Sequence, residues 1–176
     1  MNLPAYPLER ITRWDEALAL RLNRAGRSRW VHAPFRVISR LGDGIAWYAL
    51  MLALLLRFGT DAAPAVLHMI VAGLTCTALY KWLKGRTLRP RPYESHPGIL
   101  PFAAPLDHYS FPSGHTLHAV AFSLVAVAYY PWLAWLAVPF TLLVATSRVM
   151  LGLHYPSDVV AGALIGATVA GVSFTF

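Results

Sequence analysis

The sequence predicts an all-α integral membrane protein, a bundle of about five spanning helices with an amphipathic helix before it. Hydrophobic residues make up 57% of the 176 residues and charged residues only 13%. A soluble domain carries about 25% charged residues. The apolar residues also gather in long runs, and most of the charged residues lie between those runs. The length fits a single domain, residues 1–176.

The charge of the chain narrows its expected partners. The formal net charge is +7, which in a soluble protein would suggest nucleic acid binding. Because the positive charge lies outside the apolar runs, we expect the lipid bilayer and a membrane lipid substrate as partners, and no nucleic acid. The one cysteine, Cys76, lies in an apolar run and is interpreted as a packing or lipid-facing residue. Residues 1–26 are charged throughout, so we expect no cleavable signal peptide there.

The N-terminal region, 1–35, is predicted to lie at the membrane interface. Over 8–24, apolar residues recur every three to four positions with charged residues between them. This spacing predicts an amphipathic helix that is too charged to cross a bilayer. Such a helix lies on the membrane surface or packs over the loops of its own protein, and the spacing leaves both interpretations open.

Five apolar segments are the predicted spans, at about 44–58, 62–80, 114–130, 132–148 and 156–176. The first is shorter than the ~20 residues that a span needs. It could extend back through 37–41, with Arg40 and Asp43 at the interface or facing protein. A polar, proline-rich connection at 81–112 separates the second span from the third.

Two local features define the last three spans. The uncharged run 116–147 would measure ~48 Å as one helix, so Pro131 and the aromatic residues around it are expected to divide it at a membrane interface. In the last span, Gly162, Gly166 and Ala170 fall four residues apart and predict close helix packing.

This span count places unusual polar residues together. The end of span 2, the start of span 3, the end of span 4 and the start of span 5 must share one membrane face. The residues at those four places are Lys84, Arg91, Ser113, His115, Arg148, His154 and Asp158.

Three clusters among these residues indicate phosphate chemistry. The first is the basic run from Lys81 to Arg91, which by itself would also fit a flank that holds anionic lipid head groups. The second is FPSGH, at 111–115, where a proline-rich loop opens an apolar helix. Ser113 suits an N-cap, and the free N–H groups of a helix start bind anions. A capped helix start beside an interfacial histidine is the alternative for this pentapeptide.

The third cluster is SRVMLGLHYPSD, at 147–158. Asp158 lies in the first turn of an apolar helix and needs a partner, and His154 is four residues before it. A carboxylate bonded to one imidazole nitrogen leaves the other nitrogen with a lone pair, which makes a nucleophile. An N-cap aspartate beside an interfacial histidine is the alternative.

These residues resemble the three-part signature of the type 2 phosphatidic acid phosphatase superfamily. The superfamily includes lipid phosphatases, isoprenyl diphosphate phosphatases and vanadium haloperoxidases. Lys84 followed after six residues by Arg91-Pro92 resembles the first part, and 112–115, Pro-Ser-Gly-His, the second. Ser147-Arg148, His154 and Asp158 resemble the third. The resemblance covers a motif-bearing core at 84–158, matches at every position, and is similar to small bacterial members.

The resemblance implies a role for each residue. His154 attacks phosphorus and becomes a phosphohistidine, Asp158 orients it, and His115 protonates the leaving oxygen. The remaining matched residues bind phosphate oxygens: Lys84, Arg91, Ser113, Gly114 and Arg148. The family uses no metal, and we expect no metal or other cofactor here. Two histidines with different environments could hold the opposite protonation states that in-line displacement needs.

Several alternatives remain at this stage. We favour hydrolysis of undecaprenyl diphosphate, while phosphatidylglycerol phosphate and phosphatidic acid also fit. A vanadate-dependent haloperoxidase is disfavoured by the spans. A non-enzymatic anion-binding protein is disfavoured because binding would need only the cations. The sequence assigns no step to five residues of the connection, Tyr93, Glu94, His96, Asp107 and His108, and leaves the oligomeric state open.

Two arguments about membrane orientation disagree. The first forty residues carry eight arginines and three acidic residues, which by the positive-inside rule would put the active face in the cytoplasm. The resemblance to bacterial lipid phosphatases implies the extracytoplasmic face of the inner (plasma) membrane, and that is the expectation we adopt.

Overall fold

The computed structural model describes residues 6–175, with side chains from Thr12 onward, and its described part is built of helices without strands. The eight α-helices are α1 Tyr6–Ala25, α2 Arg29–Arg40, α3 Ala46–Phe58, α4 Ala63–Thr87, α5 Pro92–Ser95, α6 Gly114–Tyr129, α7 Ala134–Met150 and α8 Pro156–Ser173. A π-helical segment, Leu41–Ile45, joins α2 to α3, and 3-10 turns at Gly59–Ala62 and Pro131–Leu133 precede α4 and α7. The predicted all-α fold class is confirmed.

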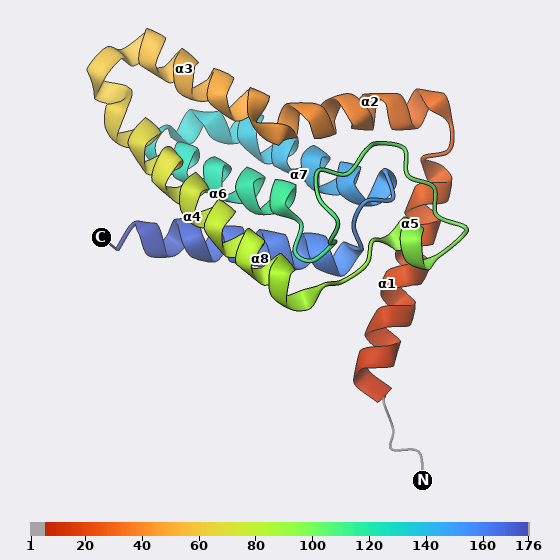
Figure 1. Cartoon of the computed structure of the whole chain (residues 1–176). Coiled ribbons are helices and arrows are strands. Elements are labelled where there is room, and N and C mark those ends of the chain that lie inside the picture. The colour runs from red at the N-terminus through yellow and green to blue at the C-terminus, as the bar shows by residue number, and fades with distance from the viewer. Residues whose placement is uncertain (1–5, 176) are drawn as a thin grey trace.

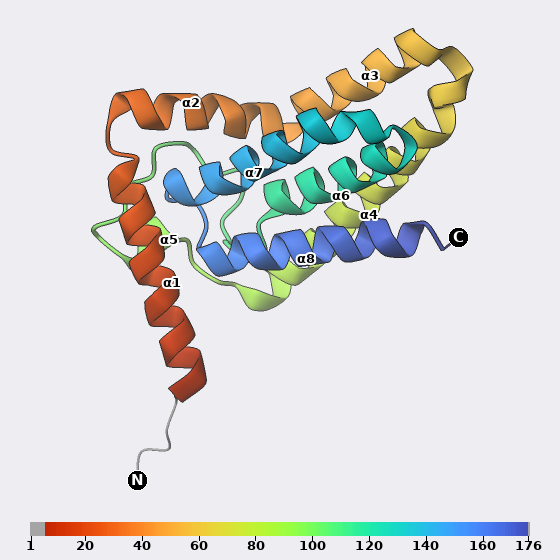
Figure 2. The ribbon, with the colours of Figure 1, turned by 180° about the vertical axis from the view of Figure 1, so that it is seen from behind.

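Helix α6 is the centre of the bundle. It contacts α4, α7 and α8, while α2 packs against α7. Figures 1 and 2 show α6 enclosed by these neighbours, with α1 projecting from one end of the bundle. Helix α6 begins at Gly114. Its N-terminal turn lies at the end of the bundle where the chain also leaves α4 and enters α8.

The outer surface of the bundle is apolar. Three stretches are long and apolar enough to cross a membrane: Arg29–Ser95, which folds back at the Gly59–Ala62 turn, Pro131–Met150 and Pro156–Ser173. Large hydrophobic side chains point outward from these helices, among them Leu56, Leu67, Leu74, Trp135, Leu142 and Leu164. A surface of this composition requires lipid rather than water. The chain is an integral membrane protein, and the number of five spans stays a prediction.

The expected small-residue face is the contact between α6 and α8. A Cβ atom at Gly162 would lie 2.6 Å from the Ser113 carbonyl oxygen, and one at Gly166 would collide with the Leu117 carbonyl. Ala170, one turn further along, is fully buried. The two backbones are therefore close enough to exclude any side chain at 162 and 166, which brings the start of α8 against the start of α6.

One predicted boundary was wrong. The polar connection was expected to start at Lys81, but α4 continues to Thr87, so Lys84 lies on a helix and is buried. The first span, expected at 44–58 with an extension back through 37–41, corresponds to α3, and the helical path does extend back through the π segment into α2.

Helix α1 packs against α7 and α8 through one face. Asp15, Ala19 and Asn23 are buried on that face, and Asn23 bonds the backbone of both Leu100 and Met150. The amphipathic helix is thus held by the loops of its own chain. Its opposite face exposes Trp14, and the contact of that face with a membrane stays a prediction.

Candidate active site

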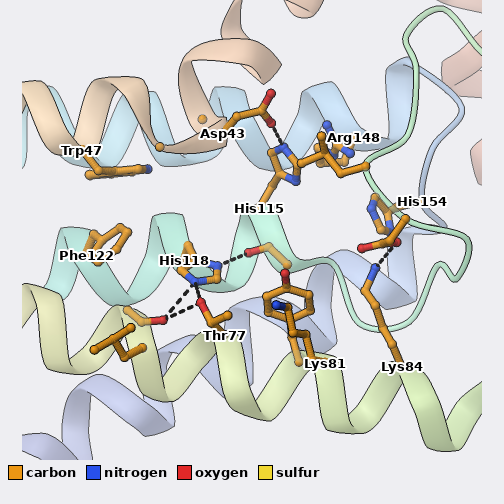
Figure 3. A pocket seen from close by; sticks show the side chains of 18 of the residues that line it. Asp43, Trp47, Thr77, Lys81, Lys84, His115, His118, Phe122, Arg148 and His154 are labelled. Carbon is orange, nitrogen blue, oxygen red and sulfur yellow. Dashed lines mark hydrogen bonds and ion pairs between the residues drawn. The ribbon is translucent and has the colours of Figure 1, made fainter.

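A cavity of about 700 Å³ lies at the end of the bundle where α4, α6 and α7 meet the loops. Figure 3 shows side chains from these elements pointing into it. Of the eight residues predicted for the site, six line the cavity: Lys84, Arg91, Gly114, His115, Arg148 and His154. Asp158 lies behind His154, and Ser113 lies beside the cavity wall. The structure thus brings together residues that are up to 74 positions apart in the sequence.

Three buried cations form what we call the cation cluster: Lys84, Arg91 and Arg148. Their exposed fractions are 6%, 1% and 3%. Arg91 is oriented by the Leu153 carbonyl, which accepts a hydrogen bond from Nη1 at 2.6 Å. Arg148 donates a hydrogen bond to Ser39 of α2, and its buried Nε has no hydrogen-bond partner. Buried positive charge with an unused donor is suited to binding an anion.

The Asp107 carboxylate lies between two of these cations. Its Oδ1 accepts hydrogen bonds from Lys84 Nζ and from Arg91 Nη2, both at 2.7 Å. Burial raises the pKa of the Asp107 carboxyl, but the hydrogen bond and charge of Lys84, with those of Arg91, outweigh it and hold the pKa below its usual value. The carboxylate is 38% exposed and comes from a loop. It therefore neutralises the cation cluster from a position that a phosphate could take.

His154, the predicted nucleophile, lies in the short loop between α7 and α8. Its backbone N–H donates to the Arg148 carbonyl at 3.1 Å, and Gly152, with φ +74°, allows the chain to turn back just before it. Arg91 Nη1 lies 3.4 Å from Nε2. Because a guanidinium only donates, Nε2 is the acceptor nitrogen and carries the lone pair.

The surroundings of His154 keep it neutral. Its side chain is almost fully buried. Burial lowers the pKa of the imidazole well below its usual value, and the charges of Arg148 and Arg91 lower it further. A neutral imidazole with a free lone pair is the form that attacks phosphorus.

The contact between His154 and Asp158 is looser than expected. We expected a hydrogen bond, but the distance from Nδ1 to Asp158 Oδ2 is 3.7 Å, and Nδ1 has no hydrogen-bond partner. The Asp158 oxygens are used elsewhere: Oδ2 accepts from the Tyr155 N–H at 2.8 Å, and Oδ1 accepts from Arg89 Nη1 at 2.7 Å. The carboxylate remains close enough to favour an Nδ1–H tautomer by charge.

Arg89 and Asp15 support Asp158 from behind, and the sequence did not single them out for this role. Arg89 Nη2 donates to Asp15 Oδ2 at 2.7 Å, so one guanidinium bridges two carboxylates. Asp15 also accepts from the Ser157 N–H at 2.8 Å. This network ties α1 to the first turn of α8. Two features of the sequence pointed to these residues. Arg89 is a cation of the basic run 81–91 that the phosphatase motif does not use, and Asp15 is a charged residue on the apolar face of the amphipathic helix.

The two residues at the start of α6 differ in their access to the cavity. Ser113 is the N-cap by position, but its hydroxyl is bonded to Thr116 and its N–H donates to the Asp158 carbonyl. Both polar groups of Ser113 thus have partners within the protein, and its contact with a phosphate stays a prediction. At Gly114, a Cβ would only reach ordinary contact with Tyr80, at 3.6 Å. Packing within the protein does not require glycine there, whereas an anion approaching the N–H groups of α6 would.

His115 lies in the first turn of α6 and faces the cavity. Its Nε2 is hydrogen-bonded to the Asp43 carboxylate, which comes from the π-helical segment (Figure 3). One turn further on, His118 bonds the Gly114 carbonyl and Thr77. Among the described residues, no group of three or more His, Cys, Asp or Glu side chains could hold a metal ion.

Comparison with known proteins decides the family. The model of the PAP2 superfamily matches residues 61–176. The chain belongs to the PAP2 superfamily. The predicted resemblance is confirmed, and with it the expected class of enzyme, a membrane lipid phosphatase.

Named relatives and solved structures agree with this family. The chain is 34% identical to undecaprenyl-diphosphatase BcrC of Bacillus subtilis over 133 residues, which are 74% of this chain and 67% of the relative. It is 35% identical to decaprenylphosphoryl-5-phosphoribose phosphatase of Mycobacterium tuberculosis over 147 residues, which are 80% and 77% of the two chains.

Two solved structures share the fold. A phosphatidylglycerolphosphate phosphatase of Bacillus subtilis matches with a TM-score of 0.75 at 24% identity, over 94% of this chain and 85% of the other. LpxE of Aquifex aeolicus matches with a TM-score of 0.78 at 27% identity, over 91% and 94%.

Proposed function

We propose that this PAP2 enzyme removes the terminal phosphate from a polyprenyl diphosphate in the plasma membrane, with undecaprenyl diphosphate as the favoured substrate. The observation that carries the proposal is that one cavity joins the cation cluster to an apolar cleft. The apolar lining consists of Trp47, Tyr48, Met51, Ile70, Leu74 and Phe122. Tyr48 of α3 and Ile70 and Leu74 of α4, which belong to this lining, are also exposed on the outer surface of the bundle. A prenyl chain could leave the cavity there without leaving the bilayer.

Lys81 supports a diphosphate over a monophosphate. It lies one turn before Lys84 on α4, lines the same cavity, and forms no hydrogen bond or ion pair within the described residues. A diphosphate carries more negative charge than a monoester and extends further from the attacked phosphorus. Lys81 supplies the additional cation for the phosphate that stays on the lipid.

The first half of the proposed reaction forms a phosphoenzyme. His154 Nε2 attacks the terminal phosphorus while the bridging P–O bond breaks and its electron pair stays on the lipid phosphate. His115 gives that oxygen a proton. The cation cluster, with the N–H of Gly114, holds the non-bridging oxygens. Fixed positive charge in a water-poor site stabilises the transition state.

In the second half, water replaces the enzyme. His115, now neutral, accepts a proton from a water molecule as the water oxygen attacks phosphorus. The P–N bond to His154 breaks, and inorganic phosphate leaves. The sum is lipid diphosphate plus water giving lipid monophosphate plus phosphate. Three cations supply the charge, so no metal is assigned a step.

A substrate panel tests this proposal. Purified protein in detergent with EDTA is offered undecaprenyl diphosphate, phosphatidylglycerol phosphate and phosphatidic acid, and phosphate release is measured. We expect the highest kcat/KM with the prenyl diphosphate and no turnover in His154→Ala. Normal turnover in His154→Ala would refute the mechanism, and a clear preference for either glycerophospholipid would refute the substrate.

A matched pair of variants tests the diphosphate contact. We expect Lys81→Met to raise KM for prenyl diphosphate about tenfold, a loss of ~1.4 kcal/mol, with less effect on prenyl monophosphate. Arg86→Met is the control, because Arg86 is on the same helix but stacks on Trp82 away from the cavity. Equal losses for both substrates in Lys81→Met would contradict the assignment.

We further propose that the active face is extracytoplasmic, as in the bacterial lipid phosphatases that the chain resembles. Labelling of single cysteines tests this, since the native Cys76 is buried. An impermeant maleimide added to intact cells should label Ser95→Cys, which lies at the active end, and not Trp132→Cys, which lies at the other. The reverse pattern would place the site in the cytoplasm.

A further inference from the structure

Asp43 reaches the cavity because the helix is irregular where α2 joins α3. The π-helical segment contains Gly44 at φ +130°, and a Cβ there would lie 2.8 Å from the Tyr48 ring. On the other side, Gly42 packs on Val144 of α7, where a Cβ would lie 3.1 Å from two methyl groups. Asp43 is thus held between two positions that exclude larger side chains. Local π-helical geometry is frequent at functional sites.

The carboxylate of Asp43 makes a direct hydrogen bond to His115. The bond uses Nε2 of the imidazole, and Figure 3 shows the two side chains pointing toward one another across the top of the cavity. The His115 side chain is 9% exposed and that of Asp43 31%. Since Nε2 is occupied by Asp43, the nitrogen left for a substrate is Nδ1.

The other groups around His115 are mainly positive. Arg148 faces it from α7, and His118 follows it on α6. Lys81 and Lys84 of α4 and His154 of the α7–α8 loop line the same cavity. The charges of Arg148, Lys81 and Lys84 oppose a protonated imidazole, which is the form that an acid catalyst needs.

Two carboxylates line the cavity, Asp43 and Asp107. Asp107 is engaged by Lys84 and Arg91. Asp43 is therefore the carboxylate available to offset the positive surroundings of His115. An anion hydrogen-bonded to imidazole both fixes the orientation of the ring and stabilises its protonated form.

We propose that Asp43 is the positioning residue of the general acid, a second Asp–His pair on the opposite side of the phosphorus from His154. Asp43 holds the protonated imidazole through Nε2–H and directs Nδ1–H at the leaving oxygen. As the P–O bond breaks, its electron pair takes the Nδ1 proton, and the neutral ring remains bonded to Asp43. This inference rests on the acid role given to His115 in the proposed function.

The proton matters most when the leaving group is a poor one. A lipid alcohol released from a phosphate monoester is a strongly basic alkoxide unless it is protonated. Nitrophenolate, and the lipid phosphate released from a diphosphate, are weak bases and leave with little help. Loss of a general acid lowers the reaction rate about 10²–10⁴-fold where the leaving group needs the proton. A variant with an impaired general acid is therefore recognised by a loss of kcat that is larger with a poor leaving group than with a good one.

The experiment compares two soluble substrates, a short alkyl phosphate and p-nitrophenyl phosphate, in purified Asp43→Asn. We expect kcat to fall about 10²-fold with the alkyl phosphate and less than about fivefold with p-nitrophenyl phosphate, with KM little changed. Asp43→Glu keeps the carboxylate, and its kcat with the alkyl phosphate should be at least tenfold higher than that of Asp43→Asn. Asp61→Asn, an exposed aspartate in the α3–α4 turn, is the control. If Asp43→Asn does not fold, Asp43→Ser is measured in its place.

The outcomes separate this inference from its alternatives. Equal loss with both substrates in a folded Asp43→Asn would make Asp43 a structural residue, and no loss with either would remove it from the reaction. A further loss when His115→Asn is combined with Asp43→Asn would also overturn the inference, because residues acting as one unit are not additive. Failure of the proposed function is seen separately, as turnover of p-nitrophenyl phosphate by His154→Ala.

Discussion

Replacing Arg89 with methionine should weaken the contacts that hold both the N-terminal helix α1 and Asp158 in place. Arg89 is the only described cation bonded to both Asp15 and Asp158, at 2.7 Å each. Methionine keeps much of the aliphatic volume of the side chain but loses the guanidinium, which lies over the Tyr155 ring at 4.0 Å. The substitution therefore removes charge and hydrogen bonds more than packing.

The magnitude follows from the burial of the two carboxylates. The side chains of Asp15 and Asp158 are 1% and 0% exposed, and Arg89 itself is 27% exposed. Removing one partner of a buried ion pair costs about 3–5 kcal/mol. We take the lower end, ~3 kcal/mol, because solvent reaches the guanidinium and because other hydrogen bonds to both carboxylates remain. For a chain of this size that corresponds to a fall in Tm of about 6–12 °C.

Thermal unfolding in detergent and turnover of p-nitrophenyl phosphate measure the two consequences. We expect the fall in Tm together with a loss of kcat of about 10²-fold, since Asp158 is freed to move relative to His154. Arg89→Lys should recover part of both, because lysine can bond one carboxylate at a time. Arg86→Met removes an exposed arginine from nearby and is the control.

A small effect would refute this reasoning. If Arg89→Met melts within about 2 °C of the unsubstituted protein, the two carboxylates do not depend on the guanidinium. If Tm falls but kcat is unchanged, the network holds α1 in place and has no part in positioning Asp158.

Three further predictions concern the cavity and the bundle. Asp107→Asn should make inorganic phosphate a stronger competitive inhibitor, with Ki lowered about tenfold or ~1.4 kcal/mol, because the carboxylate no longer competes for the cation cluster; an unchanged Ki would contradict this. Gly166→Ala should lower stability by about 1–3 kcal/mol, measured as Tm, because its Cβ meets the Leu117 carbonyl, whereas Gly171→Ala meets nothing within 4 Å and serves as the control. Because burial lowers the pKa of His154 well below 6.5, its imidazole should stay neutral as the pH falls through 6.5. NMR of labelled ring nitrogens measures this, and protonation of His154 at or above pH 6.5 would contradict the prediction.

The sequence was sufficient for the fold class and for most of the residues that gather at the cavity. Apolar runs placed the helices within a few residues, because burial in lipid demands continuous apolar segments. The span count alone put Lys84, His115 and His154 at one membrane face. The small-residue spacing at 162 and 166 also predicted where two helices touch, since only glycine permits that approach.

The pairing of polar side chains could not be predicted in this way. Asp43 lies on an irregular turn whose direction depends on the packing of Gly42 against α7. Ser113 suited phosphate binding by its position, yet its hydroxyl and N–H are both used within the protein. Such pairings depend on the rotation of each helix about its axis, which the periodicity of a nearly all-apolar helix leaves undetermined.

By itself, then, the sequence determined that this is a helical membrane protein whose motif residues meet at one face and resemble those of a lipid phosphatase. Only the tertiary structure decided which carboxylate serves which histidine. Asp158 accepts a hydrogen bond from Arg89, which lies 69 residues before it and is itself bonded to Asp15 of α1, and His115 is bonded to Asp43. The reason is physical: composition decides what enters the bilayer, whereas a hydrogen bond requires ångström-scale placement that only the packed helices provide.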